Sequence, residues 1–281
     1  MEPLPTPLVD ADWLARYHRA VRLLDCRVGP DAEARFAAGH LPGAVWADLE
    51  RDLSAPGEFA VGGRHPLPSL EDWCATLGRW GVGPETLVVA YDDRGGMLAA
   101  ARAWWMVRAV GHDAVAVLDG GLQAAFAAGL APTAEPPTLE PRLPYPASAW
   151  RLPTVNAGDV EAHRTDPAHR LIDVRAAERF AGEVEPIDPI AGHIPGAINL
   201  PCAAQLQPDG RFRPAAALRA ELEQALGDVP PSRAILQCGS GVTACHTLLG
   251  MAHAGLDGAA LYVGSWSEWC RSDRPREPDA S

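Results

Sequence analysis

The chain has 281 residues and a net charge of −12, with 47% hydrophobic and 21% charged residues. Domains usually hold about 100–200 residues, so this length favours two domains over one. The composition excludes a collagen-like, coiled-coil or disordered chain, and the acidic balance argues against nucleic acid and anionic membranes as partners. Lysine is absent, so any anion site must use arginine, histidine or backbone N–H groups.

Residues 1–7 lack the basic patch and apolar stretch that mark a signal peptide. No apolar run approaches the ~20 residues that a membrane span needs. We therefore expect a cytoplasmic protein that does not act on a membrane.

The cysteines show neither a C-x-x-C pair nor a metal-ligand spacing with histidine, so we expect no bound metal. In a reducing compartment they should be free thiols. Most buried cysteines are packing residues, so a reactive one must be identified from its surroundings. The six are Cys26, Cys74, Cys202, Cys238, Cys245 and Cys270.

The strongest organisational signal is an internal repeat of three short motifs in one order. They are a strand ending in Asp-x-Arg, an Arg-Phe pair and a Gly-His-x-Pro-Gly-Ala turn. They occupy residues 23–27, 35–36 and 39–44, and again residues 171–175, 179–180 and 192–197. This repetition indicates a duplicated domain.

In the first copy, residues 86–90 and 114–118 are short apolar runs typical of buried strands, and residues 97–110 have helical periodicity. A dense series of prolines over residues 132–153 predicts an extended linker without regular structure. We place the domain boundary near residue 145.

The second copy alternates strands and helices in the same way. Its predicted strands are residues 170–174, 234–237 and 259–263, its main helix is residues 243–254, and a last helical turn covers residues 266–270. Apolar strands separated by helices indicate parallel sheets. We therefore predict an α/β protein of two tandem domains, residues 1–145 and 146–281, each an open parallel sheet with helices on both faces.

The segment that carries the chemistry is residues 234–244, Ala-Ile-Leu-Gln-Cys-Gly-Ser-Gly-Val-Thr-Ala. Cys238 leaves a buried strand and crosses a loop with two glycines into a helix. In open parallel sheets, ligands bind beyond the carboxyl ends of the strands. Glycines allow successive N–H groups to point inward, and the helix amino terminus adds to the anion cradle. This context favours Cys238 as a nucleophile held as thiolate or persulfide, whereas cysteine statistics alone favour a packing residue.

The loop Cys-Gly-Ser-Gly-Val-Thr-Ala resembles the active loop of the 3-mercaptopyruvate sulfurtransferases, relatives of the rhodaneses. The repeated Gly-His-x-Pro-Gly-Ala turns and the Gly-Ser-Trp-Ser-Glu-Trp segment at residues 264–269 also match that family. The resemblance spans nearly the whole chain and implies two rhodanese-like domains, of which the second is catalytic. Its implied anion cradle consists of the backbone of Gly239, Gly241, Val242 and Thr243.

The first copy has Asp92 where the second has Cys238, because Ala-Tyr-Asp at residues 90–92 replaces Leu-Gln-Cys. A carboxylate cannot accept sulfur, so we expect the first domain to be catalytically silent.

The resemblance implies that Arg179 binds the carboxylate of the substrate, although a surface arginine is the alternative. Its counterpart in the first domain, Arg35, indicates that this position can also be structural. The family commonly has a second arginine before the Gly-His-x-Pro-Gly turn. This chain has Glu-Pro-Ile-Asp-Pro at residues 185–189 instead, which leaves the preferred donor open.

The resemblance also implies a Ser–His–Asp relay that handles the thiol proton. Ser240 matches the serine, and His65 and Asp52 fall near the other two positions. A hydroxyl can donate to a developing thiolate while an oriented histidine passes the proton. The alternative for His65 is an ordinary loop histidine, and for Cys245, seven residues after Cys238, helix packing is favoured over a resolving role.

The expected reaction is ping-pong transfer of sulfur from a small anionic donor, through Cys238, to a thiol, a thioredoxin-like protein or cyanide. The uncharged Gly239 and Ser240 favour 3-mercaptopyruvate over thiosulfate. Thiosulfate:cyanide transfer as the main activity and a persulfide carrier without free turnover remain alternatives. A cysteine phosphatase or arsenate reductase would need arginine at position 244, which is Ala244. No dinucleotide, P-loop or metal motif is present, so no cofactor is expected.

Overall fold

The structure is a computed structural model that describes residues 3–55 and 57–278. The chain divides into two compact units. The amino-terminal unit comprises Met1–Ser54, Pro68–Arg151 and Leu206–Phe212, and the carboxyl-terminal unit comprises Ala55–Leu67, Leu152–Gln205 and Arg213–Ser281. Each unit thus contains a short segment from the other half of the sequence.

The amino-terminal unit is built on a parallel sheet with strand order β1-β5-β4-β2-β3. In that order the strands are Leu8–Val9, Val115–Leu118, Val88–Tyr91, Arg22–Asp25 and Val45–Trp46. The two central strands β4 and β5 are fully buried, as expected for a parallel sheet covered on both faces.

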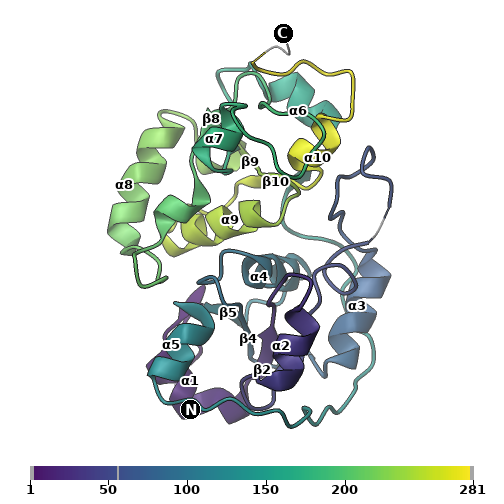
Figure 1. The fold of residues 1–281 in the computed structure, drawn as a ribbon, viewed down its shortest axis with the longest axis vertical. Coiled ribbons are helices and arrows are strands. Elements are labelled where there is room, and N and C mark those ends of the chain that lie inside the picture. The colour runs from purple at the N-terminus through teal and green to yellow at the C-terminus, as the bar shows by residue number, and fades with distance from the viewer. Residues whose placement is uncertain (1–2, 56, 279–281) are drawn as a thin grey trace. The chain divides into compact units, whose positions relative to one another are not determined.

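Helices cover both faces of this sheet (Figure 1). One core joins α1 (Ala11–Tyr17) and α5 (Gly121–Ala127) to alternate strand residues such as Val89. Helix α4 (Ala99–Ala109) contacts β4 and β5, and α3 (Leu70–Arg79) packs on it, with the Trp73 indole donating to the carbonyl of Met106 at 3.1 Å. The remaining helices are α2 (Ala32–Ala38) and the 3-10 turn His18–Ala20.

The carboxyl-terminal unit repeats this plan with strand order β6-β10-β9-β7-β8. Its strands, in that order, are Thr154–Val155, Ala260–Tyr262, Ala234–Gln237, Arg170–Asp173 and Ile198–Asn199. One core joins the sheet to α6 (Ala157–His163) and α10 (Ser265–Trp269). Helix α9 (Thr243–His253) lies against β9, with α8 (Ala215–Leu226) packed on it (Figure 1). The shorter helices are α7 (Ala177–Phe180) and the 3-10 turns Cys202–Gln205 and Pro231–Arg233.

The strand registers confirm the equivalence of the two copies. Asp25 of β2 pairs with Tyr91 of β4, and Asp173 of β7 pairs with Gln237 of β9. The residue that follows is Asp92 in one unit and Cys238 in the other, as the sequence predicted. The predicted strand 234–237 and the start of the helix at 243 match the structure, and the other predicted elements differ by one or two residues at their ends.

The proline-rich stretch contains no helix or strand over residues 132–153 and runs along the amino-terminal unit. Backbone hydrogen bonds tie its course to that unit, from Arg142 N–H to the Gly78 carbonyl (2.8 Å) and from Tyr145 N–H to the Cys74 carbonyl (2.9 Å). The stretch is therefore an extended linker without regular structure, as its composition predicted, and the structure adds that it is hydrogen-bonded to the amino-terminal unit.

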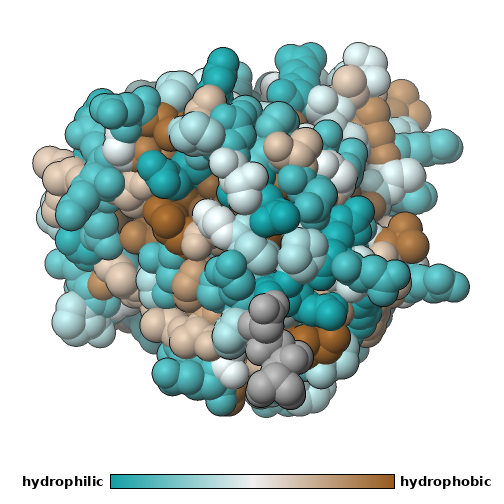
Figure 2. Space-filling view, turned by 90° about the horizontal axis from the view of Figure 1, so that it is seen from above, coloured by the Kyte–Doolittle hydropathy of each residue, from teal (hydrophilic) through white to brown (hydrophobic). Residues whose placement is uncertain are grey.

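No helix in the described part of the chain is long and apolar enough to cross a membrane. Figure 2 shows a face of the molecule on which hydrophilic residues predominate and hydrophobic residues form small, separate patches.

Candidate active site around Cys238

Cys238 directly follows β9, and α9 begins five residues later at Thr243. The loop between them contains Gly241, whose φ of +76° is in the left-handed region. A Cβ at this position would lie 2.5 Å from the carbonyl oxygen of Val263, so only glycine fits. The sequence therefore forces the chain to turn back at Gly241, which brings its N–H to the sulfur.

A corner between β10 and α10 holds the backbone of the loop. The Ser265 hydroxyl accepts a hydrogen bond from the Cys238 N–H at 3.1 Å and donates to the Tyr262 carbonyl at 2.8 Å. The Cys238 and Gly239 carbonyls accept from the N–H groups of Trp266 (3.0 Å) and Ser267 (2.8 Å). Ser265 has φ 52°, a left-handed conformation that non-glycine residues adopt rarely and mostly at functional sites.

All six cysteines are buried free thiols, so burial does not distinguish Cys238 from the others. The hydrogen bond that its sulfur accepts from the backbone does. The Gly241 N–H donates to Cys238 Sγ at 3.1 Å. By contrast, the sulfurs of Cys26, Cys245 and Cys270 donate to the carbonyls of residues 24, 241 and 267, although Cys270 Sγ also accepts from Arg271 Nη1 at 3.7 Å. A sulfur that accepts an N–H is stabilised as the anion, whereas a donating sulfur is held as the thiol. Burial raises the pKa of the Cys26 and Cys270 thiols.

The other predicted residues of the anion cradle come directly after Gly241 in the sequence. Val242 is the N-cap of α9 and Thr243 is its first residue, so the amino terminus of an 11-residue helix lies behind the loop. Cys202 also lies at this site: burial first, and then the neighbouring Cys238, raise its pKa to about 12, while a hydrogen bond with Thr243 acts in the opposite direction. Cys202 lies in no recognisable motif and was not predicted as a site residue, and this pKa keeps it protonated near neutral pH.

The structure brings His65 to Ser240, with 2.7 Å between His65 Nδ1 and Ser240 Oγ. His65 belongs to the Ala55–Leu67 segment of the carboxyl-terminal unit. The Gly62 N–H of this segment donates to Glu268 Oε1 at 3.0 Å. A Cβ on Gly63 would lie 2.4 Å from the Gly264 carbonyl oxygen, so glycine permits the close approach.

Asp52 belongs to the amino-terminal unit. Its carboxylate accepts hydrogen bonds from the Asp48 N–H (3.0 Å) and from Arg79 Nη2 (3.3 Å), and burial raises its pKa. His65 and Asp52 are thus described in different units, and a relay through Asp52 stays a prediction.

Arg179 lies at the active loop and is held by an acidic partner. Its Nη2 donates to Glu185 Oε1 at 2.7 Å, and its Nε donates to Glu185 Oε2 at 3.2 Å. Both terminal nitrogens of Arg179 lie 3.6 Å from the position that a Cβ would take on Gly239. Glu185, in the stretch that departs from the family pattern, is therefore the residue that orients this arginine.

Arg64 was not singled out from the sequence, although it directly precedes His65. Its N–H donates to Ser267 Oγ at 3.0 Å, and its Nη1 forms an ion pair with the buried Asp188. Its Nη2 lies 3.0 Å from the Cβ position of Gly239. The only local signal was the pair of glycines at residues 62–63, which predicts a close backbone approach but not its partner.

The equivalent loop of the amino-terminal unit is filled by its own side chains. The Asp92 carboxylate accepts hydrogen bonds from four backbone N–H groups, those of Arg94, Gly96, Leu98 and Ala100, at 2.8–3.4 Å. Arg35, the counterpart of Arg179, forms an ion pair with Asp93, which stands where the other unit has Gly239. Burial raises the pKa of Asp92, and the four hydrogen bonds oppose that shift.

One group of metal-ligand side chains occurs among the described residues, formed by His163, Asp166 and His169. The two imidazole rings are stacked, with centroids 4.0 Å apart and 19° between their planes. His169 Nδ1 lies 2.8 Å from Asp166 Oδ2. One ligand atom from each of the three residues lies within 4.8 Å of the others, and the group lies at the end of α6 and just after it, in the carboxyl-terminal unit.

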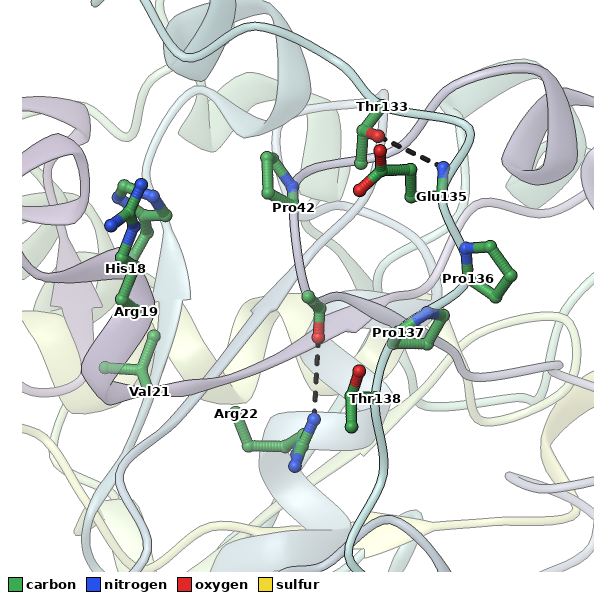
Figure 3. Close-up of a pocket in the computed structure, with 11 residues that line it drawn as sticks. His18, Arg19, Val21, Arg22, Pro42, Thr133, Glu135, Pro136, Pro137 and Thr138 are labelled. Carbon is green, nitrogen blue, oxygen red and sulfur yellow. Dashed lines mark hydrogen bonds between the residues drawn. The ribbon is translucent and has the colours of Figure 1, made fainter.

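A cavity of about 580 Å³ lies elsewhere, on the amino-terminal unit, where β2 begins. Figure 3 shows Pro42, Pro136 and Pro137 along its wall and Arg22 donating to the Gly43 carbonyl at 3.5 Å. Because ligand sites in such sheets lie at the carboxyl ends of the strands, this cavity is separate from the chemistry of the loops.

Comparison with known proteins gives a consistent result. The Rhodanese-like domain family matches residues 10–128 and 156–272. A probable 3-mercaptopyruvate sulfurtransferase of Pseudomonas aeruginosa is 45% identical over 264 residues, which cover 92% of each chain. A putative thiosulfate sulfurtransferase of Mycobacterium tuberculosis is 41% identical, covering 89% of this chain and 86% of that one. The crystal structure of the 3-mercaptopyruvate sulfurtransferase of Escherichia coli superposes with a TM-score of 0.78 at 31% identity, covering 93% of this chain and 99% of that one.

Proposed function

The chain belongs to the family of Rhodanese-like domain proteins, and from that premise we propose that it is a sulfurtransferase carrying sulfur as a persulfide on Cys238. The observation that carries the proposal is the Gly241 N–H donating to Cys238 Sγ at 3.1 Å, at the start of α9. A cradle of this kind stabilises a thiolate before transfer and the terminal sulfur of a persulfide after it.

In the proposed first half-reaction, the Cys238 thiolate attacks the sulfur of 3-mercaptopyruvate. A sulfur–sulfur bond forms, the carbon–sulfur bond breaks, and its electron pair leaves on the carbon as the enolate of pyruvate. The thiol proton of the donor is released from the new persulfide, and the enolate takes up one proton to become pyruvate, so the step is balanced. In the second half-reaction a thiol, a thioredoxin-like protein or cyanide attacks the outer sulfur and restores the Cys238 thiolate.

Ser240 and His65 form the proposed proton-handling pair. The 2.7 Å contact between Ser240 Oγ and His65 Nδ1 allows the histidine to take or return a proton through the serine hydroxyl. Asp52 is the proposed orienting group of this relay. A reducing compartment such as the cytoplasm fits this chemistry, because the cysteines are free thiols.

Mercaptopyruvate is the proposed donor because Gly239 and Ser240 add no charge to the loop and leave it suited to a monoanion. Initial rates of sulfur transfer to cyanide, with 3-mercaptopyruvate and thiosulfate assayed in parallel, test this choice. We expect a higher kcat/KM with mercaptopyruvate. A higher value with thiosulfate would make thiosulfate transfer the main activity, and sulfur retained on Cys238 without turnover on any small acceptor would indicate a carrier.

A further inference from the structure

Two guanidinium groups lie over the residue that follows Cys238. The three heavy atoms nearest to a Cβ built on Gly239 are Nη2 of Arg64, at 3.0 Å, and Nη1 and Nη2 of Arg179, at 3.6 Å. Gly239 has no side chain to separate them. An anionic group bound beside Cys238 would therefore contact both arginines.

Arg64 is fixed in this position from two directions. Its backbone is held by the N–H donation to Ser267 Oγ, and its Nη1 is paired with Asp188, whose side chain is fully buried. The Arg64 side chain itself is 14% exposed. One end of the fork is thus anchored, and Nη2 faces the loop with little rotational freedom to lose on binding.

Shared carboxylates hold the two arginines side by side. Asp188 pairs with both Arg64 and Arg179, and Glu185 also pairs with Arg179. In a chain whose net charge is −12, a small anion must be held by direct contacts with such local cations, against the field of the whole protein.

We propose that Arg64 is the second arm of a two-arginine clamp, with Arg179, that binds the carboxylate of the sulfur donor. This inference rests on the proposed function and deepens it. The stretch at residues 185–189 lacks the second arginine that the sequence resemblance leads one to expect, and its Ile187 is 56% exposed. The Ala55–Leu67 segment supplies the missing guanidinium from the other half of the sequence.

The test compares Arg64→Ala and Arg64→Lys with wild type on two donors, 3-mercaptopyruvate and its uncharged methyl ester. Removing a charge-assisted fork should lower kcat/KM for mercaptopyruvate by about 10–100-fold, mainly through KM. The lysine variant should fall between alanine and wild type. With the ester, the Arg64→Ala change should stay within about twofold, because the ester lacks the anion that the clamp binds.

Arg271→Ala is the matched control, since Arg271 Nη1 donates to the same Asp188 oxygen at 2.8 Å. It should change kcat/KM for mercaptopyruvate by less than about threefold. An Arg64→Ala loss that is equal for both donors, or that Arg271→Ala reproduces, would overturn the proposal in favour of a structural role.

Binding of pyruvate to the inactive Cys238→Ser protein, with and without Arg64→Ala, separates this inference from the proposed function. Calorimetry should show about tenfold weaker pyruvate binding without Arg64. Equal affinities would refute the clamp even if the enzyme transfers sulfur, whereas a wild type inactive on both donors would refute the proposed function alone.

Discussion

The loops after β4 and β9 have the same place in their sheets but different occupants. In the amino-terminal unit, the cradle of N–H groups is filled permanently by the Asp92 carboxylate. In the carboxyl-terminal unit, an N–H of the loop donates to the Cys238 sulfur, an atom that can gain and lose a second sulfur. In our proposal the equivalent loop position thus serves stability in one copy and chemistry in the other.

The second loop position carries the same contrast. Asp93 pairs with Arg35 and keeps that arginine engaged, whereas Gly239 brings no carboxylate to Arg179 and Arg64. Two carboxylates in adjacent positions therefore close the first site, and their replacement by cysteine and glycine opens the second. Exchanging residues between the loops tests this comparison.

The largest effect should come from Cys238→Ser, which we expect to lower kcat for sulfur transfer by at least about 10³-fold, because a hydroxyl is a poor nucleophile toward sulfur. The double variant Cys238→Ser/Asp92→Cys places a cysteine in the loop of the amino-terminal unit. It should not restore activity, because Arg35 remains in its ion pair with Asp93. Both are measured as sulfur transfer to cyanide. Recovered turnover in the double variant would show that the occupant alone decides which copy is active.

Asp92→Ala should have the next largest effect, on stability instead of chemistry. It leaves four backbone N–H groups without their acceptor, and we expect a loss of about 3 kcal/mol in the free energy of unfolding, measured in urea. Asp92→Asn keeps one acceptor oxygen and should lose less. Cys238→Ala, by comparison, should change the free energy of unfolding by about 1 kcal/mol or less. Equal losses for Asp92→Ala and Cys238→Ala would contradict the division of roles.

Ser240→Ala and His65→Ala should each lower kcat/KM by about 10–100-fold, the range of general acid–base assistance. If the two side chains act as one relay, the double variant should be no worse than the poorer single variant. Stopped-flow rates of pyruvate release are the measurement. Multiplicative losses would mean that the 2.7 Å contact has no shared role in proton transfer.

The pH dependence of the free energy of unfolding should differ between the helices behind the two loops. Helix α4 buries Arg102, whereas α9 buries His246, and burial lowers the pKa of His246 to about 3. The unfolded chain takes up this proton near pH 6.5 and the folded one near pH 3. Stability is therefore complete above pH 6.5 and is lost as the pH falls toward 3, by about 1.4 kcal/mol per pH unit.

Urea unfolding of wild type and His246→Leu between pH 7 and 4 measures this slope. The variant should show a flatter dependence on pH than wild type. Parallel curves would exclude His246 as the source of acid sensitivity.

The sequence predicted the duplicated fold and the Cys238 loop because their signals are local. Apolar runs, glycines and a cysteine at a strand end are read within a few residues, so β9 and α9 were predicted to within a residue of their observed bounds. The Gly-Ser-Gly turn likewise puts Ser240 two residues after Cys238 in the sequence.

The position of the Ala55–Leu67 segment could not be predicted in this way. Its hydrogen bonds join Gly62 to Glu268 and Arg64 to Ser267, more than 200 residues away in the sequence. Nothing in its composition states that it folds onto the second unit. Arg64 could not be singled out from the sequence because of this long-range pairing. The pairing of Arg179 with Glu185 is local, six residues apart, but it lies in a stretch that had suggested only a lost arginine.

The most direct test of the account is to find where the sulfur resides after the first half-reaction. Wild-type protein is treated with 3-mercaptopyruvate without an acceptor, digested under non-reducing conditions after alkylation, and mapped by mass spectrometry. We predict one added sulfur atom on the peptide that contains Cys238, removed by cyanide and absent from Cys238→Ser. Sulfur on the peptide of Cys202 or Cys245 instead, or its persistence in Cys238→Ser, would contradict the central claim.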